Sequence, residues 1–111
     1  GSHNPLGAVV LNNFIDKIHG NVHVILGMMN NKDHLNYISY FKNISSLITV
    51  DIKNQPNSIK GIALKEKLKH IKNISYKSSI EDAIKSVALD KDDIILITGS
   101  LYLAGEVLNL N

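Results

Sequence analysis

Two short segments of this sequence place polar or charged side chains just after apolar runs. Gly99-Ser100 follows the run Ile94–Thr98, and Lys32-Asp33 follows the run Val22–Met29. A glycine allows close backbone approach, and the free N–H groups of a following turn, with a serine hydroxyl, can bind an anion. A lysine could meet a phosphate, whereas an aspartate could cap the next helix. Taken alone, helix capping is the stronger interpretation at both places.

A third candidate lies at the start of the chain. His3-Asn4-Pro5, placed at the first turn of a helix, could present an imidazole and an amide to a ligand. The alternative is that Gly1-Ser2-His3 remains from a cleaved purification tag, in which case the native chain begins at Asn4. The other histidines lack metal-ligand spacing and are predicted to be surface or packing residues: His19, His23, His34 and His70. No metal site is predicted.

Four apolar runs are predicted strands: Val22–Met29, Leu47–Ile52, the weaker Ile74–Lys77, and Ile94–Thr98. The first, second and fourth are nearly continuous Val, Ile and Leu, which is typical of parallel strands buried on both faces.

Helical patterns lie before, between and after these runs. The segment from Pro5 to about His19 is predicted to be a helix, and the segment after Asp33 repeats apolar residues at helical spacing. Leu64–Ile71 and Ile80–Ala88 carry similar stripes, the latter preceded by a capping box of Ser78 and Glu81. A short closing helix is expected from about Leu101.

This alternation predicts an α/β fold, a Rossmann-like three-layer domain with a mostly parallel sheet of about four strands. Residues 1–111 are expected to form one domain, with strand order 3-2-1-4 by analogy with Rossmann-like sheets. Ligands of such sheets bind beyond the carboxyl ends of the strands, which is where Lys32, Asp33 and Ser100 fall.

Composition excludes several function classes. The chain has no cysteine, so thiolate zinc sites and cysteine nucleophiles are ruled out, and its net charge of +2 is too small to imply a nucleic-acid partner. No apolar run approaches the roughly 18 residues of a membrane span, so no membrane partner is predicted and a cytoplasmic location is expected. The sequence lacks G-x-x-x-x-G-K-[ST], G-x-G-x-x-G and G-x-S-x-G, so no P-loop, standard dinucleotide site or hydrolase serine is predicted.

The beginning of the chain indicates a larger structure. It starts on a turn and a helix with no strand before them, and that helix is apolar around much of its girth. We therefore expect the chain to be the back end of a larger enzyme, with catalytic residues supplied elsewhere.

Three segments resemble a known family, in order along the whole chain. Ile97–Val107 (ITGSLYLAGEV) is similar to the C-terminal signature of folylpolyglutamate synthases and bifunctional dihydrofolate/folylpolyglutamate synthases, members of the Mur ligase superfamily. Gly1–Ala8 (GSHNPLGA) resembles the D-G-[AS]-H-N-P segment that opens their C-terminal domain, which favours a native His3. Gly27-Met28-Met29 followed by Lys32-Asp33 resembles their strand-then-K-D step.

The resemblance implies an ATP-dependent ligase that adds L-glutamate to dihydropteroate or folate through an acyl phosphate, with Mg²⁺. An N-terminal P-loop domain, absent here, would bind most of the ATP, Mg²⁺ and folate, and the isolated chain would be inactive. His3 and Asn4 would lie at the interdomain site, Ser100 would help to hold glutamate, and Lys32 and Asp33 would line or brace the cleft.

Two departures and two alternatives remain. The family's aspartate before the first glycine is missing, and Asn57 stands where many members have an arginine, which puts that anion contact in doubt. The main alternative is a stand-alone Rossmann-like domain that binds a nucleotide or small ligand without catalysis. A protein-interaction module is the other, and it requires an exposed apolar patch on the first helix.

Overall fold

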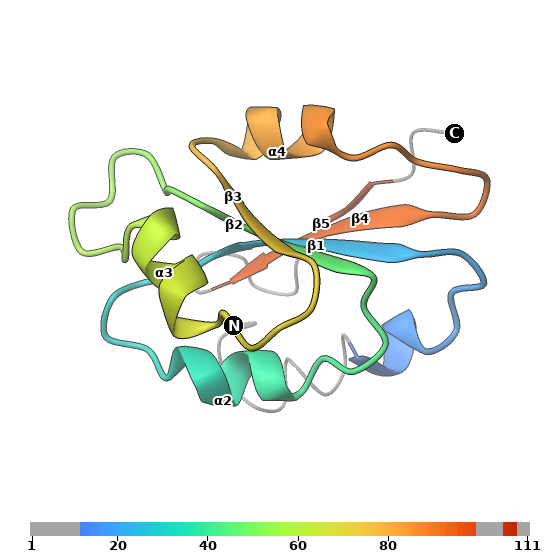
Figure 1. Ribbon diagram of the computed structural model, residues 1–111, viewed down its shortest axis with the longest axis horizontal. Helices are drawn as coiled ribbons and strands as arrows, with labels where there is room; N and C mark the ends of the chain where they lie inside the picture. Colours follow the sequence, from blue (N-terminus) through green and yellow to red (C-terminus); the bar gives the residue numbers. More distant parts are fainter. Residues whose placement is uncertain (1–11, 100–105, 109–111) are drawn as a thin grey trace.

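The computed structural model describes residues 12–99 and the backbone of residues 106–108. After a helical turn at residues 12–15, its elements in chain order are β1 (Val22–Gly27), α2 (His34–Ser39), β2 (Ser46–Val50), α3 (Gly61–Lys67), β3 (Ile74–Lys77), α4 (Ile80–Ser86), β4 (Ile94–Gly99) and β5 (Glu106–Leu108). The sheet crosses the middle of Figure 1, with α4 on one face and α2, α3 and the first helical turn on the other. In this part of the chain no helix has the length and apolar character needed to cross a membrane.

The sheet confirms the predicted fold class and the predicted strand order. Its order is β3-β2-β1-β4-β5, and the first four strands are parallel. The predicted closing helix is wrong at residues 106–108, because β5 pairs antiparallel with β4 through Ile95↔Leu108 and Ile97↔Glu106. Pairing with β5 satisfies backbone groups that would otherwise lie open along the edge of β4. Residues 101–105 of the predicted helix lie outside the described part of the chain.

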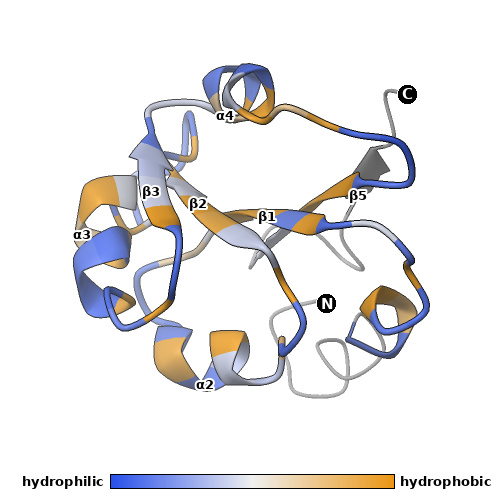
Figure 2. Cartoon of the chain, turned by 45° about the vertical axis from the view of Figure 1, so that its right-hand side comes forward, coloured by the Kyte–Doolittle hydropathy of each residue, from blue (hydrophilic) through white to orange (hydrophobic). Residues whose placement is uncertain are grey.

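Alternate residues of the strands supply two apolar layers, one on each face of the sheet. Val24, Leu26 and Leu96 pack with buried residues of α2 and α3, whereas Ile25 and Ile97 pack with residues of α4. Figure 2 shows apolar colour along much of the central strands, a mixture of apolar and polar colour on the helices, and polar colour over most of the loops. Because both faces are covered, the central strands are nearly uniform in apolar character, as predicted.

The helices begin at residues that satisfy their first free N–H groups. The Asp33 carboxylate accepts a hydrogen bond from the Asn36 N–H (3.1 Å), so the predicted cap of α2 is confirmed. The predicted capping box at Ser78 is wrong by one residue. Ser79 is the N-cap of α4, and its hydroxyl accepts from the Asp82 N–H (3.1 Å), while Ser78 donates to the Asp82 side chain (3.3 Å).

One buried carboxylate organises the amino edge of the sheet. Asp93 is 3% exposed and precedes β4. Its Oδ1 accepts from the Asn21 N–H (2.7 Å) and its Oδ2 from the Asp90 N–H (2.9 Å), so it joins the starts of β1 and β4. These two backbone hydrogen bonds lower the pKa of the Asp93 carboxyl, and the one from Asn21 has the larger effect.

Asp93 should therefore make the stability of the chain depend on pH. Since its folded-state pKa lies below its unfolded-state pKa of about 3.9, the stabilisation is complete above that value and is lost as pH falls through the folded-state pKa. Asp93→Asn should lower the midpoint of thermal unfolding at pH 7. The difference in this midpoint between the variant and the wild type should become smaller as the pH falls through the folded-state pKa of Asp93. Thermal unfolding followed by circular dichroism from pH 7 down through this pKa measures both midpoints, with Asp92→Asn, at an exposed position, as the control. A difference in midpoint that does not change with pH would contradict the stabilising role of the Asp93 carboxylate.

Candidate functional site

The carboxyl ends of β1 and β4 are two glycines that face each other. Gly27 and Gly99 are register partners, and the strand order reverses between these two strands, because β2 and β3 lie on one side of β1 and β4 on the other. Gly99 has φ +139°, and a Cβ there would lie 1.7 Å from the Gly27 carbonyl oxygen. The close approach predicted for Gly99 is thus to the neighbouring strand. Such a reversal is where open α/β sheets bind ligands.

The loop that leaves β1 carries Lys32 and Asp33 to this edge. Asp33 is exposed and engaged as the cap of α2, whereas Lys32 is half-buried and belongs to neither of the ion pairs found in the described residues. Behind them His34 is buried, and its Nε2 lies 2.9 Å from the carbonyl oxygen of Met29, closing the loop on itself. Lys32 is therefore the residue of this loop whose charge is available to a ligand.

The loop after β2 is joined to the loop after β1 by backbone hydrogen bonds. The Ile59 N–H donates to the Met28 carbonyl (3.0 Å), and the Asn30 N–H donates to the Asn57 carbonyl (2.7 Å). A hollow of about 320 Å³ lies between them and is lined by Met29, Asn30, Asn31, Pro56 and Asn57. Asn57, which stands where the family's arginine was expected, therefore borders the candidate site but offers an amide in place of a cation.

Asp51 ties the second loop to the sheet. Its Oδ1 accepts from the Gly61 N–H at the start of α3 (2.7 Å), and its Oδ2 accepts from the Tyr76 hydroxyl of β3 (2.6 Å). The hydrogen bond to this carboxylate is the main cause that raises the pKa of the Tyr76 phenol. Both carboxylate oxygens are occupied, so Asp51 acts as a brace. Together with Ile52, it also lines two hollows of about 290 and 220 Å³.

A buried pair of hydroxyls joins α2 to the end of β4. Tyr37 Oη and Thr98 Oγ1 are 2.6 Å apart, and these residues are 2% and 0% exposed. The Tyr37 ring also packs edge-on against Phe41, with centroids 5.3 Å apart. Thr98 precedes Gly99, so this hydrogen bond connects the helix that follows Lys32-Asp33 with the strand that leads to Ser100.

The structure brings together only part of the predicted site. Lys32 and Asp33 lie at the expected edge, and β4 ends at Gly99 as expected, whereas His3, Asn4 and Ser100 lie outside the described residues. Sequence reasoning missed the bracing pairs Asp51–Tyr76 and Tyr37–Thr98. The sequence signal that could have found the second pair is that Thr98 and Tyr37 each place a hydroxyl at an otherwise apolar position. Within the described chain, no three His, Asp or Glu side chains gather as a metal site would require.

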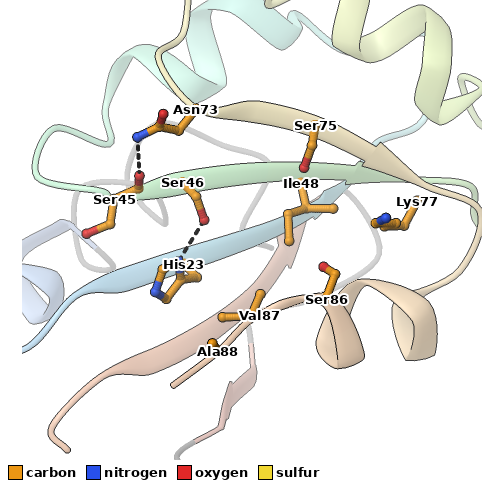
Figure 3. Close-up of a pocket in the computed structure, with 10 residues that line it drawn as sticks. All are labelled: His23, Ser45, Ser46, Ile48, Asn73, Ser75, Lys77, Ser86, Val87 and Ala88. Atoms are coloured by element: carbon orange, nitrogen blue, oxygen red, sulfur yellow. Dashed lines mark hydrogen bonds between the residues drawn. The ribbon is translucent and has the colours of Figure 1, made fainter. Parts of the chain in front are cut away.

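A further hollow, with a volume of about 470 Å³, lies on the face of the sheet that carries α4 and is bordered by the end of that helix. Figure 3 shows it running between β3 and the segment after α4, with His23, Ser46, Ser75 and Lys77 on the strands and Val87 opposite. His23 Nδ1 is 2.7 Å from Ser46 Oγ, whereas its buried Nε2 has no hydrogen-bond partner among the described residues. Neither the Lys32 loop nor Gly99 lines this groove.

Comparisons with known proteins identify both family and fold. Residues 1–101 match the family model described as Mur ligase, glutamate ligase domain. A bifunctional folylpolyglutamate synthase/dihydrofolate synthase from Yersinia pestis, complexed with AMPPNP and Mn ion, superposes with TM-score 0.76 at 24% identity. That match covers 88% of this chain and 24% of the other.

Two further structures give the same picture. The ligand-free Yersinia pestis enzyme and a bifunctional enzyme with Mn, AMPPNP and L-glutamate bound each match with TM-score 0.73 and 22% identity, over 87% of this chain and 24% of theirs. The chain thus spans about a quarter of the length of these structures. No curated protein sequence matches it significantly.

The Gly27–Gly99 contact predicts unequal effects of alanine at the two positions. Gly99→Ala combines a positive φ with overlap onto a backbone carbonyl, so we expect a loss of about 3 kcal/mol or more in unfolding free energy. Gly27→Ala meets the Ile52 side chain at 2.8 Å, which can move, so about 1–3 kcal/mol is expected. Urea unfolding compares the two; equal losses would contradict the close backbone approach.

Proposed function

The chain belongs to the Mur ligase family and matches the glutamate ligase domain of that family. From this we propose that it is part of an ATP-dependent ligase that adds L-glutamate to dihydropteroate or folate through an acyl phosphate. In this proposal it is the C-terminal domain, and a P-loop domain binds most of the ATP, Mg²⁺ and folate. The two domains enclose the reaction at the carboxyl edge of the sheet, where water must be excluded from an acyl phosphate. A cytoplasmic location, where these substrates would be available, is part of the proposal.

The family match over residues 1–101 is the observation that carries this proposal. The arrangement of the strand ends supports it, because the sheet order brings the Lys32 loop and the strand leading to Ser100 next to each other at Gly27 and Gly99. Two of the three sequence segments that resemble the folylpolyglutamate synthases begin at these two strand ends. A site formed of neighbouring strand ends can hold one ligand between them.

The proposal assigns a role to each candidate residue. Lys32 would contact the carboxylate of glutamate or a phosphate, since its charge is not engaged by any carboxylate in the described chain. Asp33 would brace the loop, because its carboxylate already accepts the Asn36 N–H. Ser100 would help to hold glutamate, and His3 and Asn4 would face the nucleotide or glutamate from the interdomain side.

Apolar exposure at the same edge fits a partner domain. Leu35 in the first turn of α2 is 52% exposed, and Ile62 in the first turn of α3 is 57% exposed. Both helices begin at the carboxyl edge, so these side chains flank the loops of the candidate site. Single exposed apolar residues are common, but two at one edge are suited to burial by a second domain.

The alternative, a stand-alone domain that binds a nucleotide or small ligand without catalysis, has the same fold and the same strand-end site. It differs in what the chain does alone. A ligase half-site should bind ATP weakly or not at all, whereas a stand-alone binding domain should bind ATP or adenosine tightly.

Reconstitution separates the two functions. The chain joined to its P-loop domain should release phosphate only when ATP, Mg²⁺, L-glutamate and either dihydropteroate or folate are all present. Mass spectrometry should find the glutamyl product, and the chain alone should show neither turnover nor tight ATP binding by calorimetry. Tight ATP binding by the chain alone, together with no turnover by the joined protein, would replace this proposal with the stand-alone alternative.

Lys32 provides a test of the site within that assay. Lys32→Ala should raise the KM for glutamate about tenfold or more, because a hydrogen bond from a charged donor contributes about 1.5–3 kcal/mol. Lys42→Ala, an exposed lysine beyond the far end of α2, is the matched control and should leave KM unchanged. Equal KM values for the two variants would remove Lys32 from the site.

A further inference from the structure

The groove on the face of the sheet that carries α4 has the size and the polar groups of a small-molecule site. Its volume of about 470 Å³ lies within the range of cavities that hold small ligands. Figure 3 shows His23 and Ser46 toward one end, Ser75 and Lys77 toward the other, and Ile48 between them. The groove therefore has two polar ends and an apolar middle.

The strand register places these side chains on one face. His23 pairs with Ser46 across β1 and β2, and Ile48 pairs with Ser75 across β2 and β3. Because alternate residues of a strand point to the same face, Lys77 projects on the same side as Ser75. The register partner of Lys77 lies four residues beyond Ser46 on β2, so the two polar ends are about 13 Å apart along the strands.

The end at Lys77 can bind an oxyanion. Lys77 is exposed and belongs to neither of the ion pairs found in the described residues. Within the same part of the chain, the Ser75 hydroxyl takes part in no hydrogen bond, so it is available to donate to a ligand. The described residues that line the groove include no acidic side chain. A neighbouring hollow shares Lys77 and is lined by Lys85 and Asp82, whose opposite charges offset each other.

A phosphate group fits this end better than a carboxylate does. Carboxylates are best matched by the planar fork of arginine, and this sequence contains no arginine. Lysine acts instead as a point charge with three donors. A phosphate monoester carries a charge of about −1.5 to −2 and three acceptor oxygens. The Lys77 ammonium and the Ser75 hydroxyl can bind such a group together.

The end at His23 and Ser46 offers a hydroxyl donor. His23 Nδ1 lies 2.7 Å from Ser46 Oγ, whereas the buried Nε2 has no hydrogen-bond partner among the described residues. A buried N–H without an acceptor is rarer than a buried acceptor without a donor, so we place the ring hydrogen on Nδ1. Nδ1 then donates to Ser46 Oγ, and the hydroxyl hydrogen of Ser46 is left for an acceptor in the groove. An uncharged oxygen, such as a sugar hydroxyl, suits this end.

We propose that this groove binds a small phosphate monoester with a hydroxylated body. The phosphate lies at Lys77 and Ser75, and the body extends over Ile48 toward Ser46. Val87, which stands opposite the strands, supplies the facing apolar contact. The site does not depend on the proposed ligase activity, because neither Lys32 nor Gly99 lines it.

The test titrates the chain with glucose 6-phosphate and follows its amide signals by NMR. Glucose lacks the phosphate and glucuronate carries a carboxylate in its place, so these two sugars are the matched probes. The signals of Ser46, Ser75 and Lys77 should move with glucose 6-phosphate and should move much less with either probe. Equal affinity for glucuronate would contradict the choice of phosphate, and groove signals that do not respond to glucose 6-phosphate would reject the site.

Two variants test the two ends separately. Lys77→Ala should weaken the binding of glucose 6-phosphate about tenfold or more, the effect expected for a charged donor. Ser46→Ala should weaken it about threefold to tenfold, as for one neutral hydrogen bond, and should leave the binding of inorganic phosphate unchanged.

Lys72→Ala is the matched control, because Lys72 is an exposed lysine just before β3 that does not line the groove. It should leave the Kd for glucose 6-phosphate unchanged. If Lys72→Ala and Lys77→Ala weaken binding equally, the attraction is a general one to surface lysines and the proposal is wrong. A Ser46→Ala variant that binds glucose 6-phosphate as the wild type does would overturn the placement of the body.

Discussion

The contact between Gly27 and Gly99 is the constraint on which this edge of the molecule depends. The Gly27 carbonyl oxygen lies where a Cβ of residue 99 would be, so the two strand ends can approach this closely only with glycine at position 99. From this point the chain leaves β1 toward α2 on one side, while β4 continues toward Ser100. The loop that carries Lys32 and Asp33 therefore leaves β1 beside a contact that is made by backbone atoms.

Polar contacts give this edge its precision, while apolar packing gives the domain its stability. The two core layers hold the helices against the sheet over a broad area, and such burial is not directional. Hydrogen bonds accepted by the Asp51 carboxylate instead fix the start of α3, and the hydrogen bond between Tyr37 and Thr98 fixes the middle of α2, relative to particular strand ends. The same division holds at the amino edge, where Asp93 joins β1 to β4.

Most of the fold could be predicted from the sequence because its signals are local. Continuous apolar runs gave β1, β2 and β4, and helical stripes gave α2, α3 and α4 with small errors at their ends. Strand β5 was not predicted, because three residues carry too little pattern and their pairing with Ile95–Ile97 depends on the finished sheet. The cap of α4 was misplaced because Ser78 and Ser79 are both suitable and only backbone geometry selects Ser79.

The candidate site was less predictable, since its braces join residues that are distant in sequence. Lys32 and Asp33 could be found because they follow a strand, but the partner of Thr98 lies 61 positions away and no local pattern identifies it. Hydroxyls within otherwise apolar runs were the available signal. Because buried hydroxyls seldom lack a hydrogen-bond partner, each of these hydroxyls predicts a polar group nearby in the fold.

The charge at this edge argues that the site is completed from outside the described residues. The ATP and glutamate of the proposed ligase carry several negative charges, yet all 12 basic residues of the chain are lysines, and Asn57 replaces the arginine expected beside the loops. Lys53 and Lys60 are exposed at the loop after β2, and Lys53 Nζ lies 3.9 Å from Glu81, whereas Lys32 is half-buried in the loop after β1. One lysine can orient an anionic group, but it cannot balance a triphosphate. In the proposed ligase, most of the positive charge would therefore come from the other domain, and closure of the two domains would bring those charges to Lys32.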